Sequence, residues 1–373
     1  MKGSEEKMNR TAKRNRRKQQ IGLITNIIFS LITLTALTGC IVLVLQNYSL
    51  RNESQEVVSR LKEMEDVQEE YIYTQADLDS YTREAVLTAE EKERENTLNE
   101  LKQMMSAGDS TVSVLRTLFP EDVVVFSDGA YSFFPIEENL KKHDYVYDHF
   151  IAQDDNEIVY TDDAGAVLSA KGIDVSKHQG DIDWRKVSQD DVSYAFIRAG
   201  FRGNTEGKLV EDEFFADNME GAADYGIQTG VYFYTQALTE EEAREEAEFV
   251  LDLIKPYDVT YPVVLDLEET GSASARTADM TKEEYTKAAI AFCETIKEAG
   301  YTPMIYGNLK TFMIMLDMDQ IEEYDKWFAY YDTSVYFPYA FEIWQYSSKG
   351  NISGIKGDVD LNVGMKDYAK DSE

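Results

Sequence analysis

The sequence predicts an α/β protein whose largest part is a flattened or incomplete TIM-like (β/α) barrel, preceded by a transmembrane helix, a helical stalk and a small β-rich segment. Three observations support this prediction. Residues 21–45 contain no charged side chain, and residues 46–106 are charged and contain neither Gly nor Pro. From Ala170 onward, strand and helix periods alternate regularly, which is typical of α/β folds.

The charge of the chain argues against nucleic acids as partners. The 373 residues carry a formal net charge of −33, although residues 1–20 hold eight Lys or Arg. Nucleic-acid binding rests on cationic contacts to phosphate, so the acidic body disfavours nucleic-acid partners.

Residues 21–45 are predicted to cross a membrane, because about 20 apolar residues span the hydrocarbon core. The basic segment 1–20 precedes this span and predicts a cytoplasmic N-terminus, with the rest of the chain outside. A cleaved signal with a lipoprotein-like box at Leu37–Cys40 is the alternative. Against it, the apolar run continues beyond Cys40.

Residues 46–106 are predicted to form a helical stalk, because Val57, Leu61, Met64 and Tyr71 follow the spacing of a weak coiled coil. Such a stalk suggests a possible homodimer. A disordered charged tether is the alternative, since polar residues interrupt the apolar seam.

Residues 107–168 are predicted to be a small β-rich segment. Asp128-Gly129 is a dipeptide typical of a tight hairpin turn between two apolar strands, and a second strand pair is expected from Glu157 onward. The function of this segment is not evident from its residues.

Residues 169–373 are predicted to form the barrel. Asp183 is expected to cap a helix that begins near Trp184, and capping boxes predict further helices after Thr239 and Thr281. The last three strands leave little room for helices, so we expect an incomplete or flattened barrel. The eight candidate strands begin near Gly172, Tyr194, Gln228, Tyr261, Thr302, Lys326, Phe341 and Asp358.

Acidic residues fall where the strands of this barrel end, the usual place for catalytic groups. Asp266 and Glu268 end the fourth strand, and the period of two places their carboxyl groups on one face, about 7 Å apart at Cα, with Glu269 on the other face. Two close carboxylates repel, which raises the pKa of one and leaves the other ionised. Glycosidases need this combination of acid and base. In an acidic chain, an Asp-x-Glu pattern alone is a weak signal.

Seven segments of residues 170–363 together resemble the successive motifs of glycoside hydrolase family 25, the muramidases or lysozymes. They include "GIDVSKHQGDIDWRKV", "YAFIRAGFRG", "YPVVLDLEE" and "WQYSSKGNISGIKGDVDLN". The resemblance implies that Glu268 is the general acid/base, that Asp266 stabilises the intermediate, and that Asp174 and Asp360 complete the catalytic carboxylates. It also implies a sugar-binding groove lined by Tyr232, Tyr306, Tyr331 and Trp344, with Asp212 as a groove or structural residue.

We therefore expect a peptidoglycan hydrolase that cleaves the β-1,4 bond between N-acetylmuramic acid and N-acetylglucosamine. It would be held in the cell membrane by its single span, with its catalytic domain outside, in a bacterium of the Gram-positive type. We expect no cofactor, and the three His show no metal-ligand spacing. The alternative function is a catalytically silent scaffold that binds the cell wall.

Overall fold

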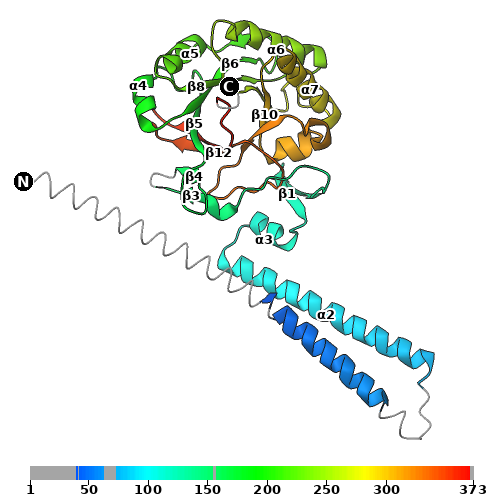
Figure 1. Ribbon diagram of the computed structural model, residues 1–373. Coiled ribbons are helices and arrows are strands. Elements are labelled where there is room, and N and C mark those ends of the chain that lie inside the picture. Colours follow the sequence, from blue (N-terminus) through cyan, green and yellow to red (C-terminus); the bar gives the residue numbers. More distant parts are fainter. Residues whose placement is uncertain (1–38, 41, 63–72, 154–156, 370–373) are drawn as a thin grey trace, which may run out of the picture. The chain divides into compact units, whose positions relative to one another are not determined.

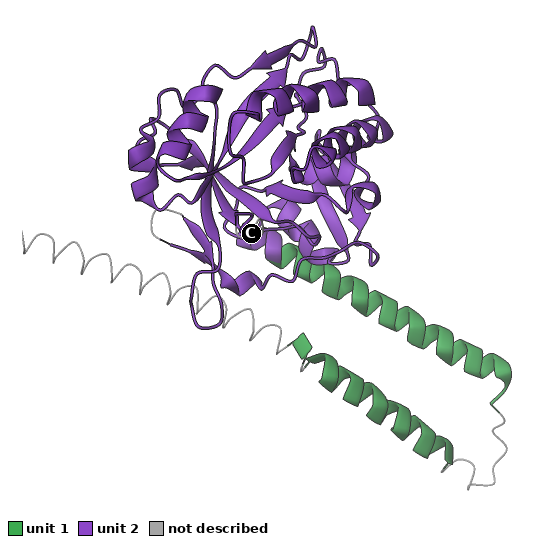
Figure 2. Ribbon diagram, turned by 45° about the horizontal axis from the view of Figure 1, so that its top comes forward, with its two compact units in different colours: residues 1–103 green, residues 104–373 purple. Residues whose placement is uncertain are grey.

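The computed structural model describes residues 39–40, 42–62, 73–153 and 157–369. The chain divides into two compact units, residues 1–103 and 104–373 (Figure 2). The predicted basic segment and most of the predicted membrane span lie outside the described residues. None of the described helices is long and apolar enough to cross a membrane.

The first unit contains two helical segments in place of one continuous stalk helix. Residues 42–62 are helical, and the long helix α2 follows at Gln75–Ala107. Tyr73 and Thr74 precede α2 in non-helical conformation, and both the backbone N–H and the hydroxyl of Thr74 donate to Asp77 at 2.8 and 2.7 Å. The Asp77 N–H in turn donates to the Thr74 carbonyl oxygen at 2.9 Å, and a new helix starts at Gln75. No side chain of α2 is buried, and self-association through the stalk remains a prediction.

The second unit is built on a closed ring of eight strands, in the order β5, β13, β12, β11, β10, β9, β8, β6 and back to β5 (Figure 1). All eight predicted strands are present. They are β5 (Ala170–Val175), β6 (Tyr194–Arg202), β8 (Gln228–Tyr234), β9 (Val263–Asp266), β10 (Pro303–Gly307), β11 (Asp325–Ala329), β12 (Ile343–Gly350) and β13 (Val359–Gly364). The short strand β7 (Leu209–Glu211) pairs with β6 outside the ring.

The ring of strands is closed, so the expectation of an incomplete barrel was wrong. The helices around the ring are unevenly distributed, as expected for the last three strands. Strand β13 is antiparallel to both of its neighbours, so the step from β12 to β13 needs no helical crossover. The helices lie on the outside of the ring (Figure 1). They are α4 (Trp184–Val187), α5 (Phe215–Asp224), α6 (Glu240–Ile254) and α7 (Lys282–Glu298), with shorter turns at Ser188–Asp190, Thr311–Met315 and Met318–Ile321. Asp183, Thr239 and Thr281 cap α4, α6 and α7 as predicted.

Alternate side chains of the ring strands fill the barrel, and aromatic rings dominate this filling. The rings of Tyr194 and Tyr261 stack at 4.6 Å between centroids, and those of Phe196 and Trp327 stack at 4.5 Å. Gly172 allows Tyr194 to lie across β5, because a Cβ at residue 172 would come within 2.1 Å of the tyrosine ring. This aromatic filling belongs to the same interior face that carries the polar residues described below.

The predicted β-rich segment packs against the barrel within the same unit. Its β1–β2 hairpin is confirmed, with Asp128 and Gly129 at φ 53° and 77° in the turn. Val123 and Val125 are buried in the same hydrophobic cluster as the outer face of the barrel. The expected second pair is present as a bridge between Thr161 and Val167, and β4 also pairs with β3. The elements are α3 (Thr111–Leu118), β1 (Asp122–Ser127), β2 (Ala130–Pro135), η1 (Tyr147–His149), β3 (Phe150–Ala152) and β4 (Ile158–Tyr160).

Candidate active site

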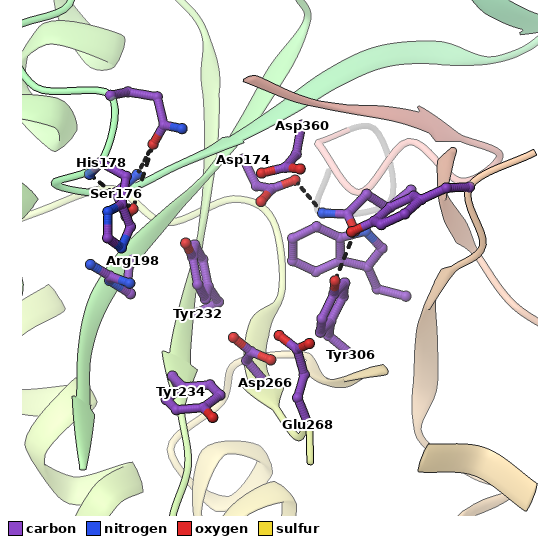
Figure 3. A pocket seen from close by; sticks show the side chains of 14 residues that line it. Asp174, Ser176, His178, Arg198, Tyr232, Tyr234, Asp266, Glu268, Tyr306 and Asp360 are labelled. Carbon is purple, nitrogen blue, oxygen red and sulfur yellow. Dashed lines mark hydrogen bonds between the residues drawn. The ribbon is translucent and has the colours of Figure 1, made fainter. Parts of the chain in front are cut away.

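Four carboxyl groups line one cavity of about 380 Å³ inside the barrel (Figure 3). Asp174 lies near the end of β5, Asp266 is the last residue of β9, Glu268 follows two residues later, and Asp360 is the second residue of β13. Figure 3 shows them as two pairs, with Asp174 beside Asp360 and Asp266 beside Glu268. The structure thus brings together the four acids that the sequence singled out.

The side-chain period of β9 explains why Asp266 and Glu268 meet. Val264 points into the barrel interior, while Val263, Leu265 and Leu267 pack in the outer hydrophobic layer. Asp266 and Glu268 continue the inward face. An odd spacing would have turned one carboxyl group into the apolar layer behind the strand.

Burial makes the Asp266–Glu268 pair hold a proton more tightly than ordinary carboxyl groups do. Burial raises the pKa of Asp266, and the negative charge of Glu268 raises it further. Burial also raises the pKa of Glu268, whereas the hydrogen bond within the pair lowers it and raises the pKa of Asp266, so Asp266 holds the shared proton in the free protein. A proton shared within the pair allows one group to act as an acid while the other is ionised.

The second pair, Asp174 and Asp360, faces each other across the β5–β13 ladder. Burial raises the pKa of Asp174 well above its ordinary value, and the charge of Asp360 adds to this effect. Gln345 and Asn362 each donate to Asp174 Oδ2 at 2.8 Å. Burial raises the pKa of Asp360 to about 6, while a hydrogen bond from Asp174 acts in the opposite direction. Asp174 therefore retains its proton to a higher pH than Asp360.

Three of the predicted aromatic residues line the cavity, namely Tyr232, Tyr306 and Tyr331. Trp344 does not, which corrects the sequence expectation. Its ring is fully buried in the outer layer, where Nε1 donates to the Tyr330 carbonyl oxygen at 2.8 Å. The reason is strand phase, because the neighbouring Gln345 occupies the inward position on β12. The tryptophan that does line the cavity is Trp327 of β11.

Asp212 acts behind the cavity and is not one of its lining residues. The residue is 2% exposed, and its carboxylate accepts a hydrogen bond from Arg198 Nε at 2.7 Å. It also accepts from the backbone N–H groups of Lys177 and Phe214 at 3.1 and 3.0 Å. Asp212 thereby fixes Arg198, whose side chain lines the cavity.

Sequence reasoning missed several lining residues that a stricter use of strand phase would have found. Arg198 shares the inward face of β6 with Tyr194 and Phe196, and it is the single charged residue in the run "YAFIRAGF". Gln345 is likewise a polar residue between the aromatic residues Trp344 and Tyr346. A polar side chain at an inward position of an apolar strand was the available signal. His178 also lines the cavity, as do Ser176, Gln179 and Tyr234.

Comparison with known proteins gives the family. A family model described as glycosyl hydrolases family 25 matches residues 173–355, the part of the chain that holds Asp174, Asp266 and Glu268. The uncharacterized protein YegX of Escherichia coli (strain K12) is 31% identical over 208 residues, which cover 53% of this chain and 70% of YegX. The chain belongs to glycosyl hydrolase family 25. The family 25 match ends before Asp360, which β13 nevertheless places beside Asp174.

Two further comparisons concern a lysozyme and an autolysin. The autolytic lysozyme of Clostridium acetobutylicum is 25% identical over 193 residues, covering 52% of this chain and 55% of that protein. The solved structure of the modular autolysin LytC from Streptococcus pneumoniae has 27% identity and a TM-score of 0.49, covering 64% of this chain and 57% of that one. The chain therefore spans little more than half the length of either protein. Its barrel is a lysozyme-like glycoside hydrolase domain.

Proposed function

We propose that the protein is a membrane-tethered N-acetylmuramidase that cleaves the β-1,4 bond between N-acetylmuramic acid and N-acetylglucosamine in peptidoglycan. The observation that carries this proposal is the buried Asp266–Glu268 pair at the end of β9, which faces a cavity lined by tyrosines. Aromatic faces suit the apolar faces of sugar rings, and paired carboxyl groups suit glycosidic bond cleavage.

Glu268 is the proposed general acid. It protonates the glycosidic oxygen as the bond to the anomeric carbon breaks, and the ionised Asp266 stabilises the positive charge that develops there. Asp266 does this either by direct attack on the anomeric carbon or by orienting the acetamido group of the substrate for that attack. Glu268 then removes a proton from the incoming water, which restores its acid form and completes hydrolysis with retention.

Arg198 supports the assignment of roles within the pair. The positive charge of Arg198 lowers the pKa of Asp266, against the larger effects of burial and of Glu268. This charge opposes the protonation of Asp266 and thereby favours transfer of the shared proton to Glu268, as the proposed roles require. Asp212 holds Arg198 in place for this purpose.

The tether is proposed from the sequence alone. The uncharged residues 21–45 follow the basic segment 1–20, an order that favours an N-terminus in the cytoplasm and the barrel outside the cell membrane. A tethered enzyme has a high effective concentration at the wall without a separate wall-binding domain. Protease treatment of intact cells tests this topology, since only an outward-facing barrel is degraded.

The bond specificity is tested by the products. Purified full-length protein is incubated with peptidoglycan, the new reducing ends are reduced with borohydride, and the resulting sugar alcohols are identified after acid hydrolysis. A muramidase yields muramitol from its new ends. Glucosaminitol alone would show cleavage of the other glycosidic bond, and the absence of new ends would favour a silent scaffold.

A further inference from the structure

A second cavity adjoins the catalytic one and has no role in the mechanism above. Its volume is about 410 Å³, within the range of about 300–1,000 Å³ typical of ligand sites. Tyr331 lines both cavities and is 57% exposed, so its ring forms the boundary between them. A molecule that occupies the catalytic cavity can therefore continue past Tyr331 into the second one.

Residues on both sides of the family 25 domain boundary form this second cavity. Ala152 and Ile158 come from β3 and β4, which precede the matched residues 173–355. The opposite wall comes from β12, whose pairing with β13 shifts register after Gln345 and again after Ser347. Such irregularities redirect a strand next to an active site. The second cavity is thus formed partly by the β-rich segment, which gives that segment a place beside the substrate.

Tyr331 is held firmly enough to act as a fixed wall. Its hydroxyl donates to Gln345 Oε1 at 2.9 Å, and the Tyr306 hydroxyl donates to the same oxygen at 2.7 Å. Gln345 is itself fixed by its bond to Asp174. The hydroxyl end of the Tyr331 ring is therefore anchored toward the catalytic acids, while the rest of the ring is open to a ligand.

The remaining lining groups indicate the chemistry of the occupant. Lys349 supplies a positive charge and Asp332 a negative charge, and Thr333, Ser347 and Ser348 supply hydroxyl groups. In a strand that carries stems the lactyl group of muramic acid is an amide, so the sugar rings themselves offer no charge to pair with Lys349 or Asp332. A short peptide that carries both carboxylates and an amino group would use both. The stem peptide of peptidoglycan has this composition, and it branches from the muramic acid that the proposed reaction places in the catalytic cavity.

We infer that the second cavity binds the stem peptide attached to the muramic acid at the cleavage site. This inference rests on the proposed function, because the stem enters the second cavity only when its sugar occupies the first. Lys349 binds a stem carboxylate, Asp332 binds the stem amino group, and Tyr331 separates sugar from peptide. The enzyme therefore prefers glycan strands that carry stems over bare glycan.

Hydrolysis by the full chain tests the inference with two substrates, intact peptidoglycan and the same glycan stripped of stems by an amidase. We expect Lys349→Glu to raise KM on stem-bearing strands by about threefold to tenfold, with little change in kcat and no change on bare glycan. Lys356→Gln is the matched control, since Lys356 is exposed and lines neither cavity, and it should change nothing. An equal effect of Lys349→Glu on both substrates, or no effect on either, overturns the inference.

A binding measurement separates this inference from the proposed function. In the Glu268→Gln background, co-sedimentation with insoluble peptidoglycan reports binding without hydrolysis. Binding that depends on stems and is weakened by Lys349→Glu or by Ala152→Trp, which fills the cavity, supports the stem site even if the wild-type chain proves inactive. Binding that is the same with and without stems contradicts it.

Discussion

Gln345 donates a hydrogen bond from Nε2 to Asp174 Oδ2 over 2.8 Å, and this bond joins the proposed catalytic acids to the tyrosines of the same cavity. The carbonyl oxygen of the same amide accepts from the hydroxyls of Tyr306 and Tyr331. All four residues line the catalytic cavity. One neutral side chain therefore fixes the position of a carboxyl group and of two aromatic rings.

Replacing Gln345 with Leu should impair both stability and substrate binding. Two tyrosine hydroxyls would lose their acceptor and Asp174 one of its donors, and the buried groups of Tyr306 and Asp174, left unpaired, each cost about 1–3 kcal/mol. We expect lower stability in urea unfolding and a higher KM. Gln345→Glu is the companion variant, because it keeps an acceptor for the tyrosines but adds a negative charge beside Asp174. We expect this variant to lose activity mainly through a lower kcat. Normal stability and KM in Gln345→Leu would show that this network is dispensable.

Arg198→Gln should change the pH dependence of kcat/KM on its acidic side. Arg198 lowers the pKa of Asp266, so its removal raises that pKa, and Asp266 is then protonated at pH values where it was ionised. If ionised Asp266 is required, the acidic limb of the profile moves to higher pH. Arg198→Lys keeps the charge and should lie closer to the wild type. An unmoved acidic limb in Arg198→Gln would contradict the role given to this cation.

Trp344→Phe should reduce stability and leave KM unchanged. Trp344 is buried in the outer layer, and its substitution leaves the Tyr330 carbonyl oxygen without the indole donor, at a cost of about 1–3 kcal/mol. Denaturant unfolding measures this loss, and kinetics on peptidoglycan give KM. Tyr331→Ala serves as the comparison, because it removes a ring that lines both cavities and should raise KM. A similar rise of KM in Trp344→Phe would show that Trp344 contributes to substrate binding after all.

Arg116→Ala should loosen the β-rich segment from the barrel. Arg116 lies 3.8 Å from the centroid of the Tyr336 ring and donates to the Tyr330 hydroxyl at 2.5 Å. We expect faster hydrogen exchange in β1 and β2, with α6 and α7 unchanged as internal controls. Unchanged exchange in the hairpin would mean that the apolar contacts of Val123 and Val125 suffice to hold it.

The eight strands and the catalytic pair could be predicted from the sequence because both depend on local periodicity. The alternation from Val263 to Glu268 is sufficient to place Asp266 and Glu268 on one face. Trp344 was misplaced because it was assigned from a motif, although the phase of β12 puts Gln345 on the inward face. The same phase argument would have added Arg198.

Long-range contacts could not be predicted in this way. Nothing near Asp128 indicates that its carboxylate would accept from Lys310 Nζ at 2.7 Å, 182 residues away. Lys310 also bonds Glu269, for which the sequence indicates only that it points away from Asp266 and Glu268. By contrast, the break before α2 was visible in principle, because Thr74 and Asp77 have the spacing of a helix cap.

The central claim is that Glu268 is the general acid/base, and the release of reducing ends from peptidoglycan by Glu268→Gln tests it most directly. General acid–base catalysis contributes about 10²–10⁴-fold, so kcat should fall by that amount in a protein that unfolds at the same denaturant concentration as the wild type. Glu269→Gln is the matched control, since it removes an adjacent carboxylate that does not line the catalytic cavity, and it should retain activity. Release by Glu268→Gln at the rate of the wild type would contradict the assignment.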